Sequence, residues 1–336
     1  MQDSSSPTPV LAADPQPNLF RRLISAVGPQ NLSLLIALIV LIAIFGSLRP
    51  DAFFSARNFT AILNAITILG IVAMAQTVVI ISGGIDVSVG SIVGMSSVVA
   101  AIAMTMIDSP AAGILAAVIS GGLGGLVNGI LITKGRVNPI ITTLATLAIF
   151  QGIAYIISNG KAIGVLNTEF NWIGAGRIVG VPMTVIVFLV IAALMIFFMR
   201  ATDIGRNIYA IGGNANAARL AGIRIQRYRI GVYALTGIIC GIAAVLLTAR
   251  STSGQPSSGS AGLELEAITA AFLGGCAMAG GRGTIIGTIL GVLIIGTLNN
   301  GMLLMMVPNF YQLLAKGLLL LAAVMIMEFR TGNKQP

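Results

Sequence analysis

The residue types that usually carry catalysis or bind metal ions are scarce in this 336-residue chain. It contains no His, two Cys and ten acidic residues. Without His there is no Ser-His-Asp or Cys-His catalytic set and no His/Cys zinc site. Cys240 and Cys276 lie in apolar stretches, so they indicate no disulfide framework. A phosphate-binding G-x-x-x-x-G-K-[ST] loop is also missing, because Tyr155 stands where Gly160-Lys161 would need the first Gly. The sequence predicts a non-catalytic chain that holds no metal or other cofactor of its own.

Acidic and amide side chains in apolar stretches are the remaining candidates for contact with a small molecule. A charge at the centre of a lipid-spanning helix costs about 2.5–3.5 kcal/mol, and the acids Asp86, Glu264 and Glu266 lie at the ends of apolar runs instead. Most uncharged polar residues in such runs form helix–helix contacts, worth about 0.6 kcal/mol each. A neutral polar lining also suits an uncharged, hydroxyl-rich solute. We predict that a solute path or its gate includes Asn64, Gln76, Asp86, Ser88, Gln151, Glu264 and Asn300.

The elements that must position these residues are membrane-spanning helices. Hydrophobic residues make up 56% of the chain and charged residues only 9%, with a mean hydropathy of +0.98, whereas a soluble domain has about a quarter charged residues. Backbone groups in lipid must be paired within the segment, so an apolar run of about 20 residues predicts an α-helix. The sequence predicts an all-α polytopic membrane protein with about ten transmembrane helices, the eighth short enough for a half-helix: 32–48, 59–82, 90–107, 111–133, 137–158, 182–199, 230–249, 264–279, 284–303 and 310–327.

Two series of glycines predict where these helices pack closely. Gly121, Gly125 and Gly129 are spaced four residues apart, and so are Gly283, Gly287 and Gly291. Such spacing places small residues on one helix face and lets two backbones approach. Packing is therefore the expected role of these glycines, rather than binding of phosphate.

The chain divides into a tail, a membrane domain and a short end. Residues 1–30 begin with a Ser- and Pro-rich stretch that predicts a disordered cytoplasmic tail. The run 32–48 is too long for the core of a signal peptide, so we expect it to be retained as the first span. The transmembrane domain then covers 31–330, with a cytoplasmic loop at 200–229, and 331–336 form a cytoplasmic C-terminus.

The distribution of basic residues orients the spans. Ten spans place both termini on one side, which we expect to be the cytoplasm. Thirteen basic residues then lie inside: Arg21, Arg22, Lys134, Arg136, Arg200, Arg206, Arg219, Arg224, Arg227, Arg229, Arg282, Arg330 and Lys334. Five lie outside: Arg49, Arg57, Lys161, Arg177 and Arg250. This asymmetry follows the positive-inside rule and explains the net charge of +9 without a nucleic-acid partner.

The longest inside loop, 200–229, has a pattern of its own. Gly212-Gly213-Asn214 predicts a turn, Ala215 to Ala221 a short helix, and Gly222 the C-cap of that helix. Charge alone favours a loop that only orients the neighbouring spans. The turn and helix are more than orientation needs, and they suit docking into a groove of a partner protein.

Two pairs of segments from the two halves of the sequence resemble each other. The acidic segment Gly84–Val89 follows the second span, and Gly262–Ala267 follows the seventh. Asn128-Gly129 ends the fourth span, and Asn300-Gly301 ends the ninth. In the predicted topology the first acidic segment faces in and the second faces out. Inverted repeats of spans 2–5 and 7–10 would produce this pattern, and the solute path would then lie between the halves near the midplane.

Several segments resemble those of a known family. Ser82–Ser91 (SGGIDVSVGS) resembles the GGIDLSVGS signature of permeases of ribose/xylose/galactose-type bacterial ABC sugar importers. Further segments match in the family's order, from about Asn58 to Glu328: Gly205–Asn214, Ala217–Ile223, Glu264–Ile268, Gly274-Gly275, Gly280–Gly283 and Asn300–Met302. Departures are mild, since Val87 replaces the usual Leu and Cys276 the usual Thr or Ser.

The resemblance implies a fold like that of vitamin B12-type importer permeases and transport by alternating access. It implies a second permease copy (the same chain or a related one), ATP-binding subunits that carry ATP and Mg²⁺, a periplasmic binding protein that delivers a monosaccharide, and a bacterial inner membrane with its lipid as the location. The loop at 200–229 would be the element that couples to the ATP-binding subunit. The coupling residues carried over from the family are Gly205, Arg206, Asn207, Gly212, Gly213, Asn214, Ala218, Arg219, Ala221 and Gly222.

Other functions remain open at this point. A permease for branched-chain amino acids, nucleosides or a furanosyl signal would belong to the same superfamily, although the strong matches at 82–91 and 205–214 favour sugar. An ion-coupled secondary carrier usually needs intramembrane carboxylates or His, but backbone carbonyls can also hold Na⁺. A membrane-embedded enzyme would need a catalytic constellation that the sequence lacks.

Overall fold

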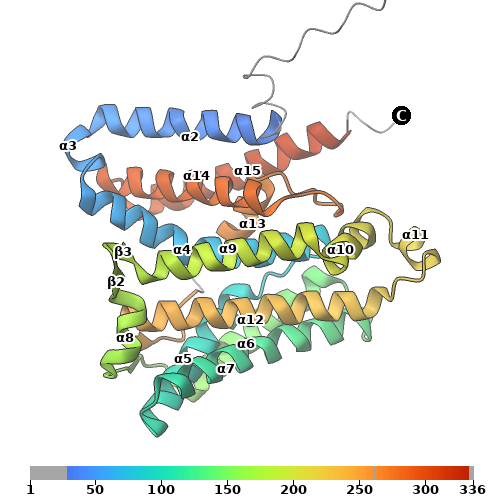
Figure 1. Ribbon diagram of the computed structural model, residues 1–336, viewed down its shortest axis with the longest axis horizontal. Coiled ribbons are helices and arrows are strands. Elements are labelled where there is room, and N and C mark those ends of the chain that lie inside the picture. Colours follow the sequence, from blue (N-terminus) through green and yellow to red (C-terminus); the bar gives the residue numbers. More distant parts are fainter. Residues whose placement is uncertain (1–28, 260–261, 333–336) are drawn as a thin grey trace, which may run out of the picture.

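The computed structural model describes residues 29–259 and 262–332, which form a bundle of long helices (Figure 1). Among these residues, eight helices are long and apolar enough to cross a membrane. Each coincides with one of the predicted runs. They are α2 (Pro29–Leu48), α4 (Ala56–Ile81), α5 (Val89–Ile107), α6 (Pro110–Thr133), α7 (Pro139–Ile157), α9 (Met183–Ala201), α12 (Ile225–Ser251) and α14 (Ile285–Leu304).

The two remaining predicted runs also form helices. α13 (Leu263–Leu273) has 11 residues, which is about 16 Å at 1.5 Å per residue. It therefore reaches across about half of a hydrocarbon core of ~30 Å. α15 (Asn309–Gly332) is apolar over Asn309–Met325. The prediction of an all-α polytopic membrane protein is confirmed, while eight of the ten predicted runs are long and apolar enough to span the membrane among the described residues.

Short elements lie at the two ends of the bundle (Figure 1). One end, named the α8 end, holds α3 (Pro50–Phe53), α8 (Thr168–Ala175) and the hairpin of β2 (Arg177–Ile178) and β3 (Val181–Pro182). The opposite end, named the α10 end, holds α10 (Asp203–Gly213) and α11 (Ala215–Leu220). β1 (Ile163–Gly164) pairs antiparallel with β4 (Ser253–Gly254).

Both ends of the described chain lie on the same side of the bundle. α2 begins and α15 ends at the α10 end (Figure 1), as an even number of crossings requires. The predicted tail 1–30 lies almost wholly outside the described residues, as do residues 333–336.

Polar side chains and prolines fix where several helices begin. Ser55 Oγ accepts a hydrogen bond from the Asn58 N–H (3.2 Å) at the start of α4. Asn138 Oδ1 accepts from the Ile140 N–H (2.9 Å) at the start of α7, where Pro139 takes the first helical position. These caps satisfy N–H groups that have no partner within the helix.

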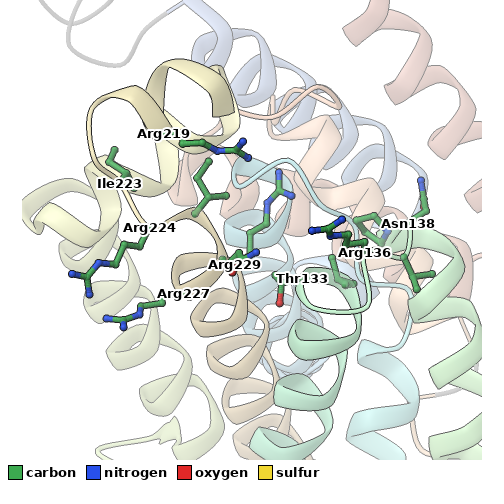
Figure 2. A pocket seen from close by; sticks show the side chains of 13 residues that line it. Thr133, Arg136, Asn138, Arg219, Ile223, Arg224, Arg227 and Arg229 are labelled. Carbon is green, nitrogen blue, oxygen red and sulfur yellow. The ribbon is translucent and has the colours of Figure 1, made fainter.

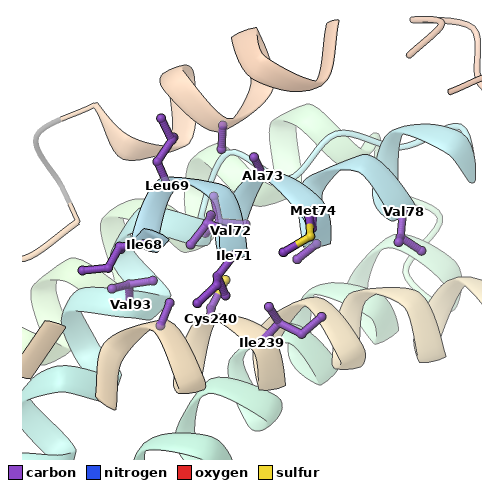
Figure 3. Packing of buried hydrophobic residues seen from close by; sticks show 14 of the residues in the cluster. Ile68, Leu69, Ile71, Val72, Ala73, Met74, Val78, Val93, Ile239 and Cys240 are labelled. Atoms are coloured by element: carbon purple, nitrogen blue, oxygen red, sulfur yellow. The ribbon is translucent and has the colours of Figure 1, made fainter. Parts of the chain in front are cut away.

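The core of the molecule lies around α4. The apolar window of α4 is 89% buried, compared with 28% for α7 and 11% for α2. Ile71, Val72 and Met74 of α4 are fully buried and belong to one cluster with Val93 of α5 and Cys240 of α12 (Figure 3). A helix that is apolar on every side and buried on every side occupies the centre of a bundle, so polar residues of α4 face other helices.

The two glycine series pack helices closely, as predicted, except that Gly283 lies before α14 with a φ of +146°. A side-chain carbon added at Gly121 or Gly125 of α6 would overlap backbone carbonyls of α12, and one at Gly287 or Gly291 of α14 would overlap carbonyls of α13 and its C-cap. Such contacts bring backbones together where a larger residue would separate the helices.

The helix contacts follow a repeated pattern. α12 packs against α5 and α6, while α4 packs against α13 and α14. α5 contacts α7, and α13 contacts α15. α4 and α12 contact each other. This is the pattern that inverted repeats of spans 2–5 and 7–10 would produce, with α4 and α12 as the equivalent central helices.

Candidate functional site

The starts of α5 and α13 meet inside the protein. Residues 82–88 leave helical geometry after α4 and pass through the interior, where Asp86 and Ser88 are fully buried. A side-chain carbon added at Gly90, the second residue of α5, would overlap Glu264 Oε2 and the Gly259 carbonyl. Because α13 is a half-helix that leads to the α10 end, this meeting point lies near the middle of a bilayer. We name it the helix crossing.

A hydrogen-bond network holds the loop that enters α5. Asp86 Oδ1 accepts from the N–H (2.8 Å) and the hydroxyl (2.6 Å) of Ser88. Asn128 Nδ2 of α6 donates to Ser88 Oγ (2.7 Å) and to Asp86 Oδ2 (3.4 Å). The Gln76 amide of α4, oriented to satisfy both of its groups, pairs with the N–H and the carbonyl of Asp86 at 3.1 Å each. The structure thus brings together Gln76, Asp86 and Ser88, and their hydrogen bonds fix the course of the backbone at the helix crossing.

Glu264 lies at the same crossing without such a network. Its side chain is 9% exposed, and its Oε2 has no hydrogen-bond partner among the described residues. The other acid of α13, Glu266, pairs through Oε1 with Lys316 Nζ of α15 at 2.6 Å. A buried acceptor without a partner is costly. Glu264 is therefore placed to accept a hydrogen bond from a group outside the described chain.

The other three predicted path residues lie away from the helix crossing. Asn64 Oδ1 accepts from the Thr184 hydroxyl (3.0 Å), which links α4 to α9. Asn300 Nδ2 donates to Asn58 Oδ1 (2.8 Å), which links α14 to α4. Gln151 is partly exposed on α7 and joins neither group. Asn64 and Asn300 thus make helix–helix contacts of the kind expected for most polar residues in the spans.

Four glycines join α10 to both halves of the bundle. The Gly281 N–H donates to the Ile81 carbonyl at the end of α4 (2.9 Å). A side-chain carbon added at Gly212 would overlap the same carbonyl, and one at Gly280 would lie 2.9 Å from the Gly83 Cα. The end of α10 thus contacts the end of α4 and the loop before α14, backbone against backbone. We name Gly83, Gly212, Gly280 and Gly281 the glycine junction.

Two side-chain hydrogen bonds add to this junction. Asn207 Nδ2 donates to the Tyr228 hydroxyl of α12 (2.6 Å), and the Tyr209 hydroxyl donates to the Gly283 carbonyl (2.8 Å). Gly205 is buried close to carbonyls at the end of α9. α10 is therefore attached to α4, α9, α12 and the loop before α14, so its displacement would move all four.

The predicted turn at Gly212-Gly213-Asn214 is wrong in its detail. Gly212 and Gly213 are the last two residues of α10, and Asn214 is the N-cap of α11, with its Oδ1 accepting from the N–H groups of Asn216 and Ala217 at 3.0 Å each. The helix continues through both glycines because Thr202 caps its start and buried isoleucines hold its inner face. Packing thus overrides the low helix propensity of glycine.

α11 ends as predicted. Gly222 has a φ of +81°, and its N–H donates to the Arg219 carbonyl (3.0 Å), which is the usual glycine C-cap conformation. Ala218 is buried, so one face of α11 is fixed to the bundle. The predicted coupling residues left exposed are Arg206, which pairs with Asp203, and Gly213, Asn214, Arg219, Ala221 and Gly222.

Sequence reasoning missed part of this site. Asn128 had the same signal as other polar residues in the spans, and nothing in its spacing pointed to Asp86. Gly83 and Gly281 belong to Gly-Gly pairs, as Gly212 does. The repetition of that pair at three places in the chain was the available signal for the glycine junction, but their close approach is visible only in three dimensions.

This arrangement defines a multi-pass membrane protein whose two sets of helices make matching contacts and whose helix pair α10–α11 is attached at one end of the bundle. A family model described as a branched-chain amino acid transport system permease component matches residues 58–324, and the chain belongs to this permease family. The ribose import permease of Bacillus subtilis is 40% identical over 300 residues, covering 88% of this chain and 92% of that protein.

Other relatives have different sugars in their names. An L-arabinose ABC transporter permease of Azospirillum brasilense is 39% identical over 297 residues, covering 88% of this chain and 87% of that protein. The D-allose transport system permease of Escherichia coli is 37% identical over 288 residues, covering 85% and 88%. No solved structure matched the chain.

Proposed function

We propose that this chain is the membrane-spanning permease subunit of an ATP-driven importer that moves a monosaccharide across the bacterial inner membrane. Similar proteins are permeases for ribose, L-arabinose and D-allose, which are all small, uncharged and rich in hydroxyls. The family description mentions branched-chain amino acids instead. An amino acid carries a carboxylate that needs a cationic or N–H partner, whereas the side chains of the helix crossing include two acids, Asp86 and Glu264. Sugar hydroxyls, as donors, suit these groups better.

The glycine junction is the observation that carries the coupling role. ATP would be bound and hydrolysed by a separate subunit that docks on α10 and α11, and that subunit would hold the Mg²⁺. When the two nucleotide-binding subunits close, α10 moves. Because Gly212 meets the end of α4 and the loop before α14 backbone against backbone, little of that movement is lost in rotamer changes. The two halves then tilt and alternate access to the path.

The solute path passes the helix crossing. Glu264 has a free acceptor there, and the network around Asp86 keeps the start of α5 in place. A second permease copy, either this chain or a related one, completes the pore. A periplasmic binding protein supplies the affinity for the sugar, so the permease needs only transient hydrogen bonds along the path.

The α10 end faces the cytoplasm in this proposal. The arginines of α10, α11 and the start of α12 lie there, which agrees with the positive-inside rule. Both termini are then cytoplasmic, and the α8 end meets the binding protein in the periplasm.

Reconstitution tests the proposal. Proteoliposomes contain this chain alone, or this chain with its ATP-binding subunit and binding protein, and uptake of ribose, L-arabinose, D-allose and leucine is measured with and without ATP. We expect sugar uptake only in the complete, ATP-supplied system. Uptake by the chain alone on an ion gradient would identify a secondary carrier, and uptake of leucine in place of sugars would identify an amino acid permease.

A further inference from the structure

Among the described side chains, one ion pair lies within the membrane-spanning helices. The arginines around the cavity at the α10 end, such as Arg136 and Arg229, lie where the ATP-binding subunit would dock (Figure 2). Lys316 instead lies inside the apolar segment Asn309–Met325 of α15, about 10 Å along the helix at 1.5 Å per residue. Its Nζ pairs with Glu266 Oε1 of α13 at 2.6 Å. A charged residue at this depth is costly and usually has a function.

The pair joins α13 to α15 in largely apolar surroundings. The side chains of Lys316 and Glu266 are 30% and 19% exposed, and Ile295, Leu298 and Leu319 lie around them. Among the described residues, α15 packs chiefly against α13. A buried ion pair is a poor source of net stability compared with apolar side chains, whereas it is suited to fixing the register between two helices. Its expected role is therefore to fix how α13 and α15 fit together.

The pair holds α13 on the side opposite Glu264. Residues two apart on an α-helix point about 200° apart around its axis, so Glu264 and Glu266 face nearly opposite sides of α13. Glu264 faces Gly90 of α5, and Glu266 faces Lys316 of α15. A rotation of α13 that moved one carboxylate would therefore move the other.

The two helix starts at the helix crossing are held in different ways. The start of α5 is fixed by the hydrogen bonds of Asp86 with Ser88 and Asn128. α13 begins after Gly262, which has a φ of +92° and gives the helix no side-chain cap. Glu264 Oε2 has no partner among the described residues. The first turn of α13 is instead tied to another helix by the ion pair with α15.

We propose that Lys316 is a positioning residue for the solute path. Through its ion pair with Glu266, it fixes the rotation of α13 and keeps the Glu264 carboxylate directed at the helix crossing. The proposal rests on the function proposed above, in which Glu264 accepts hydrogen bonds from the sugar. The two acids of α13 also suit the positive end of its helix dipole, but the dipole alone does not call for a lysine in an apolar helix.

Removal of both charges tests this role. Lys316→Met/Glu266→Gln keeps similar side-chain volumes and leaves neither charge unpaired, so its unfolding midpoint should match or exceed that of the wild type. We expect maximal ATP-driven sugar uptake in the complete proteoliposomes to fall about tenfold, because a carboxylate displaced by about an ångström loses its hydrogen bonds to the sugar. The concentration of loaded binding protein that gives half-maximal uptake should not change. Lys316→Arg keeps the charge and should keep most of the uptake.

The Glu264→Gln background tests whether Lys316 acts through Glu264. If it does, adding Lys316→Met/Glu266→Gln to Glu264→Gln should lower sugar uptake no further. Losses that multiply would show that the ion pair acts independently of Glu264 and would overturn the proposal. Wild-type uptake by Lys316→Met/Glu266→Gln alone would overturn it as well, while leaving the proposed transport function intact.

Amide hydrogen exchange tests the positioning of α13 without any sugar, so it stays decisive even where the chain transports another solute. The permease is measured with its ATP-binding subunit in nanodiscs. In Lys316→Met/Glu266→Gln, exchange over residues 263–269 should become faster and exchange in α5 should not, because a helix start that is no longer held opens more often.

Thr184→Val is the matched control for this measurement. It removes the hydrogen bond between α9 and Asn64 of α4, away from the helix crossing, and should leave exchange in α13 unchanged. Unchanged exchange in α13 of Lys316→Met/Glu266→Gln, or equal increases there in both variants, would overturn the proposal.

Discussion

Two carboxylates at the helix crossing have opposite surroundings. Asp86 accepts hydrogen bonds from Ser88 and Asn128 and is held by Gln76 through its backbone. Glu264 is buried nearby with Oε2 unpaired. A satisfied buried network specifies a local structure, whereas an unpaired acceptor is available to a ligand. The two acids should therefore respond differently to substitution.

Replacement of Asp86 should affect the fold first. Asp86→Ala leaves the N–H and the hydroxyl of Ser88 without their acceptor, which we expect to lower the free energy of unfolding by about 2–4 kcal/mol. The measurement is the thermal unfolding midpoint of the purified permease. Asp86→Asn keeps the shape and part of the network and should cost less. An unchanged midpoint for Asp86→Ala would contradict a positioning role.

Replacement of Glu264 should affect transport first. Glu264→Gln removes a charge that has no partner, so the unfolding midpoint should stay the same or rise. ATP-driven sugar uptake should fall at least tenfold, because a hydrogen bond to a charged acceptor is worth about 1.5–3 kcal/mol. Uptake assays in the complete reconstituted system measure this. Wild-type uptake by Glu264→Gln would remove this residue from the path.

At the scale of elements, α10 and the half-helix α13 distinguish this fold from a plain bundle of spans. Long apolar runs predicted α2, α4 to α7, α9, α12 and α14 well, since continuous hydrophobicity in lipid leaves only the helix as a solution. The pattern did not predict that α10 would extend through Gly212 and Gly213, because that outcome depends on packing against α4 and α9. The cap at Gly222 could be predicted because a glycine C-cap depends only on residues close by in the chain.

Gly212 of the glycine junction and its neighbour Gly213 differ in the space around them. A side-chain carbon at Gly212 would overlap the Ile81 carbonyl, whereas one at Gly213 would meet nothing within 4 Å. Gly212→Ala should therefore separate α10 from α4 and uncouple ATP hydrolysis from uptake. Gly213→Ala should keep coupling and gain up to about 1 kcal/mol of helix stability.

Coupling is measured as sugar transported per ATP hydrolysed in proteoliposomes. The predicted turn treated Gly212 and Gly213 alike, whereas the close backbone contact of Gly212 predicts that its substitution is the damaging one. Equal coupling in the two alanine variants would argue against transmission through the glycine junction.

At the scale of the whole molecule, the contacts that matter join residues far apart in the chain. Gly90 meets Glu264, and Asn128 meets Asp86. No spacing rule connects such pairs in a single sequence, so the sequence predicted a repeat from short matching segments but not the helix crossing. The orientation of the bundle in the membrane stays a prediction, which depends on counting basic residues in loops.

Cysteine labelling tests the orientation of the molecule. Leu166 near the α8 end and Leu220 at the α10 end are 93% and 91% exposed, while the native Cys240 and Cys276 are fully buried and should stay unlabelled. In spheroplasts, a membrane-impermeant maleimide should label Leu166→Cys at once and Leu220→Cys only after permeabilisation. The reverse pattern would invert the proposed topology.

The two breaks before α5 and α13 also bear on how a polar molecule gets across. Residues 84–88 and 255–259 lie beside the start of α5 largely without regular helical pairing, and peptide groups in lipid need a hydrogen-bond partner that acyl chains cannot supply. The side of the molecule that holds these two breaks must therefore face water or another subunit. The dry layer between the two aqueous compartments is then thinner than the ~30 Å hydrocarbon core, and a sugar sheds its hydration over a short stretch only.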